Sequence, residues 1–117
     1  MSTEILKKEE FTLVNIGSDR LDANNAPDLK TEFVRLTSNG ETNLVLDMNN
    51  CSYCDSSGLR AILVGNRLCE DNLGTFILCG LQPDVEYLIR ISMLHTVLLI
   101  TKSVEEAENL LIRKKEM

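Results

Sequence analysis

Residues 44–59 of the chain read LVLDMNNCSYCDSSGL. The apolar start of this stretch predicts a short buried strand, and the polar middle predicts a loop. Asp55, Ser56 and Ser57 are all favourable N-cap residues, so a helix is expected to follow directly. A helix start carries free N–H groups and the positive end of the helix dipole, which together favour an anion, including a phosphoryl group on a nearby side chain. Helix capping alone also explains the sequence DSSG.

The rest of the chain alternates between strand-like and helix-like patterns on both sides of this stretch. Strands are expected at residues 3–8, 11–16, 44–46, 76–79 and 97–100. Helices are expected from Asn24 or Asn25 to Ser38, after residue 58, from about Pro83, and from a capping box at Ser103 and Glu106. Such alternation favours an α/β fold. We therefore expect one domain over residues 1–117, with a four- or five-stranded mixed sheet and one layer of about four helices.

The spacing of apolar residues indicates which faces of these elements are buried. In the first helix, the inward stripe is expected to comprise Ala26, Leu29, Phe33 and Leu36. In the third helix, the inward residues are expected to be Val85, Leu88, Ile89 and Met93. The runs at 44–46, 76–79 and 97–100 are nearly continuously apolar, which predicts central strands that are covered on at least one face.

The 117-residue chain is acidic, with a formal net charge of −6 at pH 7. Nucleic-acid binding through a basic face is therefore not expected, because it needs clustered Lys and Arg. The start of the chain lacks the pattern of a signal peptide, and no apolar run approaches the roughly 20 residues of a membrane helix. We expect a cytoplasmic protein without membrane insertion, whose four cysteines are reduced and mostly buried.

Four motifs, in this order, resemble the STAS family, which is named for sulfate transporters and anti-sigma factor antagonists. The first in the chain is GSDRLDANNAPDL at 17–29, which is similar to the family's G-x-(L/I)-D…A-P-x-L with two extra residues after Gly17. The strand, loop and DSSGL of 44–59 form the second motif. GLQPDV at 80–85 and SVEEA at 103–107 complete the set. The resemblance runs across nearly the whole chain.

In the antagonist branch of this family, the serine directly after the Asp accepts phosphate from an anti-sigma factor that is also a Ser/Thr kinase. The resemblance implies that this position is Ser56, and that a metal-dependent Ser/Thr phosphatase removes the phosphate. It implies a binding protein and not an enzyme, with no cofactor and no metal, which sequesters the kinase when Ser56 is unmodified and so releases a sigma factor. The other switch-loop and partner-binding residues are expected to be Asp22, Asp55, Ser57, Gly58, Leu59 and Arg60.

Three positions depart from the family pattern. Leu73-Gly74 stands where Gly-Gly is common, and Met93 replaces the Gly of an S-G-L sequence after the third helix. Because Met93 replaces a flexible glycine, the family pattern does not predict the conformation of that loop. Arg60 stands where antagonists often have Gly, and it changes the charge beside the switch.

Other interpretations of the sequence remain. Cys51 and Cys54 have the spacing of a metal or redox pair, but no second pair matches it, which favours buried structural cysteines with a redox influence left open. His95 lies in a different segment from Ser56, and DSSG is not a nucleophile elbow, which favours a surface or hydrogen-bonded histidine over a hydrolase. The main alternative function is a stand-alone STAS module of a lipid-transport or signalling-scaffold complex.

Overall fold

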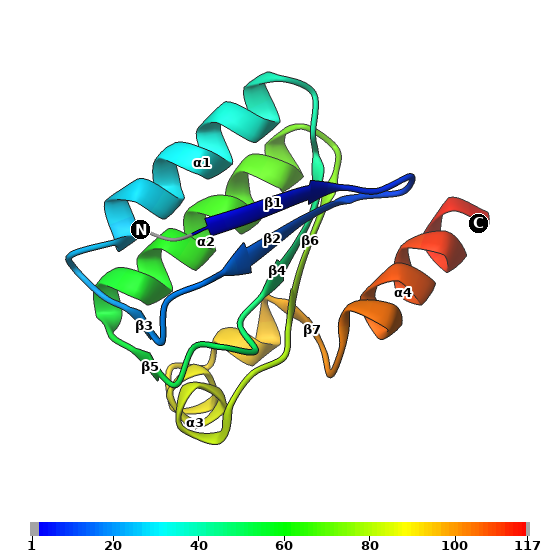
Figure 1. Cartoon of the computed structure of the whole chain (residues 1–117). Helices are drawn as coiled ribbons and strands as arrows, with labels where there is room; N and C mark the ends of the chain where they lie inside the picture. Colours follow the sequence, from blue (N-terminus) through cyan, green and yellow to red (C-terminus); the bar gives the residue numbers. More distant parts are fainter. Residues whose placement is uncertain (1–2, 117) are drawn as a thin grey trace.

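The computed structural model describes residues 3–116, and it shows a sheet with helices on both faces (Figure 1). The elements in chain order are β1 (Thr3–Lys7), β2 (Thr12–Ile16), β3 (Arg20–Leu21), α1 (Ala26–Ser38), β4 (Asn43–Asp47), β5 (Tyr53–Cys54), α2 (Ser56–Asp71), β6 (Thr75–Cys79), α3 (Pro83–Ile91), the 3-10 helix η1 (Leu94–Thr96), β7 (Leu99–Thr101) and α4 (Val104–Glu116). The helices and strands expected from the sequence are all found, with shifted ends, and β3, β5 and η1 are additional.

The main sheet has five strands in the order β1-β2-β4-β6-β7. β1 and β2 are antiparallel, and the remaining pairs are parallel. This arrangement confirms the expected α/β fold with a mixed sheet. A separate ribbon of β3 and β5 lies beyond the carboxyl end of β4. Within residues 3–116, no helix is both long enough and apolar enough to cross a membrane.

The main core lies between one face of the sheet and the helices α1, α2 and α3. The expected stripe of α1 is confirmed, because all of its members are buried: Ala26, Leu29, Phe33 and Leu36. Gly65 of α2 lets two rings approach closely, since a Cβ there would lie 2.8 Å from the ring of Phe33 and 2.7 Å from that of Phe76. These rings meet edge to face with their centroids 5.6 Å apart. This packing fixes α1 and α2 over the centre of the sheet.

The fourth helix lies on the opposite face of the sheet (Figure 1). Ala107 and Leu111 of α4 pack there in a second cluster with Phe11, Leu13, Val45, Ile77 and Cys79. The expected single layer of helices is therefore wrong. The physical reason is that β2, β4 and β6 are apolar on both faces, so each face needs a cover. The capping box is present in part, because the N–H of Glu106 donates to Oγ of Ser103 at 3.1 Å.

The segment after α3 also differs from expectation. Residues 97–100 do not form a covered central strand, because β7 is an edge strand in which Leu99 and Ile100 are 40% and 37% exposed. Met93, which was expected to point inward, is 61% exposed. Val85 and Ile89 do face the main core, as expected. An apolar run therefore indicated a strand here without indicating where in the sheet it lies.

Candidate functional site

A two-stranded ribbon holds the loop before α2 against the core. β3 and β5 are parallel, with Arg20 opposite Tyr53 and Leu21 opposite Cys54. The side chains of Leu21 and Cys54 are buried in the main core. The N–H of Asp55 then donates to the carbonyl oxygen of Leu21 at 3.2 Å. The ribbon therefore leads the chain directly into α2.

Asp55 and Gly58 fix the start of α2. Asp55 is the N-cap, and its Oδ1 accepts a hydrogen bond from the N–H of Gly58 at 3.1 Å. A Cβ at position 58 would lie 2.6 Å from Sγ of Cys54 and 2.7 Å from the carbonyl oxygen of Leu21. Only glycine lets the helix begin this close to the ribbon. Because the Asp55 side chain caps the helix, the hydroxyls of Ser56 and Ser57 are not used as caps.

Ser56 is the first residue of α2, and it is exposed to solvent. Its hydroxyl has no hydrogen-bond partner among residues 3–116. After the cap, the first turn of α2 contains no acidic residue, and Arg60 is exposed one turn further on. The positive end of a 16-residue helix therefore lies beside an open hydroxyl, which is an arrangement that accommodates a phosphoryl group.

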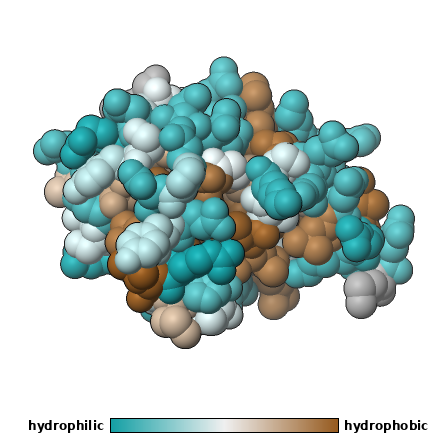
Figure 2. Space-filling view, turned by 90° about the horizontal axis from the view of Figure 1, so that it is seen from below, coloured by the Kyte–Doolittle hydropathy of each residue, from teal (hydrophilic) through white to brown (hydrophobic). Residues whose placement is uncertain are grey.

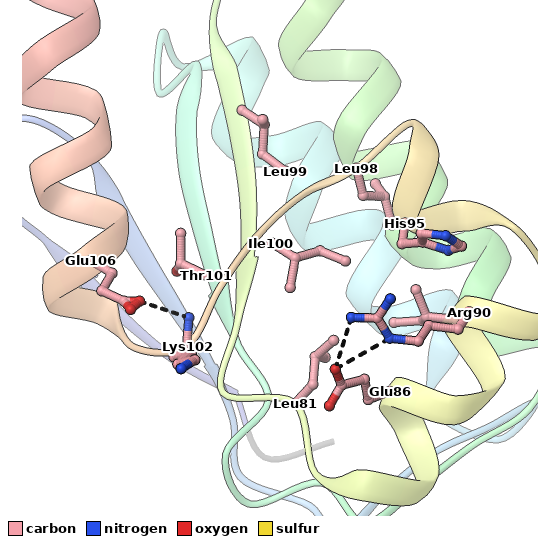
Figure 3. A pocket seen from close by; sticks show the side chains of 11 residues that line it. Leu81, Glu86, Arg90, His95, Leu98, Leu99, Ile100, Thr101, Lys102 and Glu106 are labelled. Carbon is pink, nitrogen blue, oxygen red and sulfur yellow. Dashed lines mark hydrogen bonds and ion pairs between the residues drawn. The ribbon is translucent and has the colours of Figure 1, made fainter.

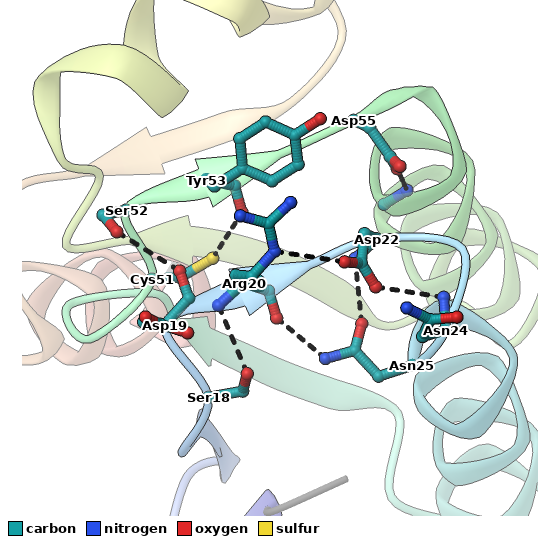
Figure 4. A network of polar contacts seen from close by, with 11 residues as sticks. Ser18, Asp19, Arg20, Asp22, Asn24, Asn25, Cys51, Ser52, Tyr53 and Asp55 are labelled. Carbon is teal, nitrogen blue, oxygen red and sulfur yellow. Dashed lines mark hydrogen bonds and ion pairs between the residues drawn. The ribbon is translucent and has the colours of Figure 1, made fainter.

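A network of polar side chains lies beside this helix start (Figure 4). The guanidinium carbon of Arg20 lies 4.1 Å from the centre of the Tyr53 ring, and Nε of Arg20 lies 3.3 Å from Oδ2 of Asp22. Oδ1 of Asp22 accepts a hydrogen bond from the N–H of Asn24 at 3.0 Å. The side chain of Asn25 donates to the carbonyl of Arg20 at 2.7 Å and accepts from the N–H of Asp22 at 2.9 Å. These bonds fix the loop between β3 and α1.

The family follows from a match along most of the sequence. A model of the STAS domain matches residues 2–107. The chain belongs to the STAS-domain family. A relative from Bordetella bronchiseptica, BtrV, is named as a candidate anti-sigma factor antagonist and is 31% identical to this STAS domain over 83 residues, which is 71% of this chain and 72% of the relative.

Solved structures share the fold of this STAS domain. The RsbS protein of Moorella thermoacetica, in a variant with serine replaced by glutamate, is 22% identical and covers 100% of both chains with a TM-score of 0.84. The phosphorylated form of SpoIIAA from Bacillus is 20% identical and gives a TM-score of 0.71 over 92% of this chain and 97% of its own. These similarities concern the arrangement of the backbone.

The site residues expected in this STAS domain take three kinds of position. Ser56 and Arg60 are exposed. Asp22, Asp55 and Ser57 are half-buried around the same helix start. Gly58 and Leu59 are buried where the first turn of α2 packs on the ribbon and the core. Arg20, Tyr53 and Asn25 adjoin the site but were not expected there, since the two-residue strands β3 and β5 are too short to show a pattern.

The four cysteines of this STAS domain are free and buried, as expected. Burial raises the pKa of the Cys54 thiol to about 12, and it also raises the pKa of Cys51. Thiols with a raised pKa are weak nucleophiles near neutral pH. Within residues 3–116, no group of three or more His, Cys, Asp or Glu side chains is placed to hold a metal ion.

A hollow of about 620 Å³ lies on another part of this STAS domain, between α3, β7 and α4 (Figure 3). Its lining residues are Leu81, Glu86, Ile89, Arg90, His95, Leu98, Leu99, Ile100, Thr101, Lys102 and Glu106. Figure 2 shows apolar side chains gathered on this side of the molecule. His95 is half-buried there, and its Nδ1 is buried without a hydrogen-bond partner among residues 3–116, which corrects the expectation of a surface or hydrogen-bonded histidine. None of the expected site residues lines this hollow.

Proposed function

We propose that this STAS domain is an anti-sigma factor antagonist that phosphorylation of Ser56 switches off. The observation that carries this proposal is the exposed hydroxyl of Ser56 at the first position of α2, which has no hydrogen-bond partner among residues 3–116. The relative named as a candidate anti-sigma factor antagonist, at 31% identity, supports the same class of function. Ser57 and Arg60 follow Ser56 on α2, Asp55 precedes it as the N-cap, and Asp22 belongs to the polar network beside the helix start.

The covalent step is a phosphoryl transfer from ATP that an anti-sigma factor with Ser/Thr kinase activity catalyses. Oγ of Ser56 bonds to the γ-phosphorus of ATP, the bond from that phosphorus to the ADP oxygen breaks, and a base on the kinase takes the hydroxyl proton. A Ser/Thr phosphatase hydrolyses the ester and restores the serine. The STAS domain supplies the acceptor and its surroundings and is not itself an enzyme.

The switch acts through charge at a small polar surface. A phosphoryl group adds about −1.5 to −2 charges at neutral pH. The half-buried carboxylates of Asp22 and Asp55 already make the border of the site negative, and docking of a partner would exclude water from it. The added charge therefore costs desolvation and repels acidic groups of the partner. A loss of about 1.4 to 4 kcal/mol of binding free energy corresponds to a tenfold to thousandfold weaker complex.

In the unmodified state, the protein binds the anti-sigma factor, and the sigma factor is released to the polymerase. In the phosphorylated state, the anti-sigma factor is free to bind the sigma factor again. All of these partners act in the cytoplasm. Neither nucleic acid nor the membrane is a direct partner of this chain, whose formal net charge is −6.

Mass spectrometry with the cognate kinase tests the acceptor. Incubation with kinase and ATP is expected to add one phosphoryl group, and Ser56→Ala is expected to abolish this addition. Ser38→Ala, at an exposed serine at the end of α1, is the matched control and is expected to be phosphorylated like the wild type. Equal phosphorylation of the wild type and Ser56→Ala would contradict the proposal.

Titration calorimetry with the anti-sigma factor tests the switch. The unmodified chain is expected to bind at least tenfold more tightly than the chain phosphorylated on Ser56. Equal affinities of the two forms would contradict control by this residue. Recovery of a transporter ATPase in place of an anti-sigma kinase in a pull-down would instead favour a STAS module of a lipid-transport complex.

A further inference from the structure

Among the described residues, the guanidinium of Arg20 has two contacts, one to the half-buried Asp22 and one to the exposed Tyr53. Its side chain is 54% exposed, and its ion pair with Asp22 is a single contact of 3.3 Å through Nε. Its second contact is the stack on Tyr53, a residue that is itself 42% exposed. Exposed ion pairs and exposed cation–π contacts contribute little to stability. A stronger anion nearby would therefore compete successfully for this side chain.

Arg20 lies in the strand next to the segment that leads into α2. Arg20 lies opposite Tyr53 in the parallel pair. The N–H of Asp55 donates to the carbonyl oxygen of Leu21 at 3.2 Å, which ties the residue after Arg20 to the residue before Ser56. Figure 4 shows the guanidinium between the Tyr53 ring and the Asp22 carboxylate, with Asp55 beyond them.

The charges around Ser56 leave few cations to balance a phosphate. Asp19, Asp22 and Asp55 adjoin the ribbon, and Figure 4 shows Arg20 among them. Arg60 lies on α2 itself, one turn after Ser56. Arg20 approaches from the ribbon side, with a planar group whose paired N–H donors match phosphate oxygens.

We propose that a phosphoryl group on Ser56 draws Arg20 away from Asp22 and Tyr53 and into an ion pair with the phosphate. This inference rests on the proposed function of Ser56. The pair leaves the Tyr53 ring uncovered and the Asp22 carboxylate without its cation. Phosphorylation thus changes the surface of the ribbon as well as the charge of the helix start. Arg20 is a positioning residue that makes the partner-binding face differ between the two states.

Phosphorus NMR on the full chain tests this pair without any kinase. Phosphoserine is placed at position 56 during translation, so the result does not depend on whether a natural kinase modifies Ser56. The second pKa of the phosphate is measured in wild type and in Arg20→Ala, and the variant is expected to raise it by several tenths of a unit, because a nearby cation favours the dianion. Arg67→Ala, an exposed arginine further along α2, is the matched control and is expected to leave it unchanged.

The ring signals of tyrosine give a second measurement in the unmutated chain. The chain has two tyrosines, and Tyr87 on α3 serves as the internal reference. Phosphoserine at 56 is expected to shift the Tyr53 ring signals in the direction that Arg20→Ala shifts them in the unphosphorylated chain. An unchanged Tyr53 signal, or the same phosphate pKa in the wild type and Arg20→Ala, would overturn the inference. Failure of any kinase to modify Ser56 would instead count against the proposed function alone.

Discussion

Leu73 and Met93 hold backbone conformations that glycine adopts more readily. Their φ angles are 61° and 62°, in the left-handed region, and both side chains are exposed. These are two positions at which the sequence departs from the family pattern by lacking glycine. At both positions a residue with a side chain therefore has a backbone conformation that suits glycine. A side chain with a Cβ costs about 1–2 kcal/mol in this region, so each position stores local strain.

Replacing Met93 by glycine is expected to stabilise the protein. Met93→Gly removes the steric cost of the left-handed conformation and loses little burial, because this side chain is 61% exposed. We expect an increase of about 1 kcal/mol in the free energy of unfolding, measured by urea denaturation. Ser92→Gly is the matched control, since Ser92 has a φ of −86° and should gain nothing. A less stable Met93→Gly would show that the methionine side chain contributes packing that outweighs the strain.

At the scale of the elements, the sequence predicted the longer helices and strands and missed the two-residue strands. The stripe of α1 and the apolar runs of β4 and β6 span enough residues to show their type. The two-residue strands β3 and β5 show no period, so the ribbon that carries Arg20 and Tyr53 stayed hidden. The site at Ser56 is a prediction from its motif, whereas the residues across the ribbon from it depend on strand register, which the structure gives.

Glu41 ties the hairpin of β1 and β2 to the segment after α1. Its carboxylate lies 2.7 Å from Nζ of Lys7 and accepts a hydrogen bond from Oγ1 of Thr12 at 2.6 Å. The hydrogen bond from Lys7, and then that from Thr12, lower the pKa of Glu41 below its usual value of 4.5. A lowered pKa in the folded state means that the contribution to stability is present above the unfolded-state pKa and is lost as the pH falls through the folded-state value.

We expect Glu41→Gln to lower the free energy of unfolding at pH 7 by at most about 1 kcal/mol, because Lys7, its partner in the ion pair, is largely exposed. The deficit is expected to shrink as the pH falls from about 4.5 through the lower folded-state pKa, below which the wild-type carboxyl is neutral in both states. Urea denaturation at pH 7 and at acid pH measures both effects. Glu9→Gln, at an exposed glutamate in the turn after β1, is the control and is expected to show no deficit at either pH. A deficit in Glu41→Gln that is independent of pH would rule out the charge as its cause.

At the scale of the whole molecule, the sheet separates two apolar clusters of unequal size. The main core packs under α1, α2 and α3 and contains Cys69. The smaller cluster, under α4, contains Cys79. Burial raises the pKa of both thiols to about 12, so the two have the same reason to be unreactive while the fold is closed. A difference in their labelling rates therefore reports which layer opens first.

We expect α4 to detach more often than the molecule unfolds, because little apolar surface holds it. Iodoacetamide labelling at pH 8, followed by peptide mass spectrometry, should then modify Cys79 faster than Cys69. Ile62→Val, in the main core, should accelerate Cys69 alone, by about 2- to 12-fold for a cost of 0.5–1.5 kcal/mol. Leu111→Ala should accelerate both, since Leu111 is released in local and in global opening alike. Equal acceleration of both cysteines by Ile62→Val would mean that the two clusters open only together, and that α4 is no separate layer in stability.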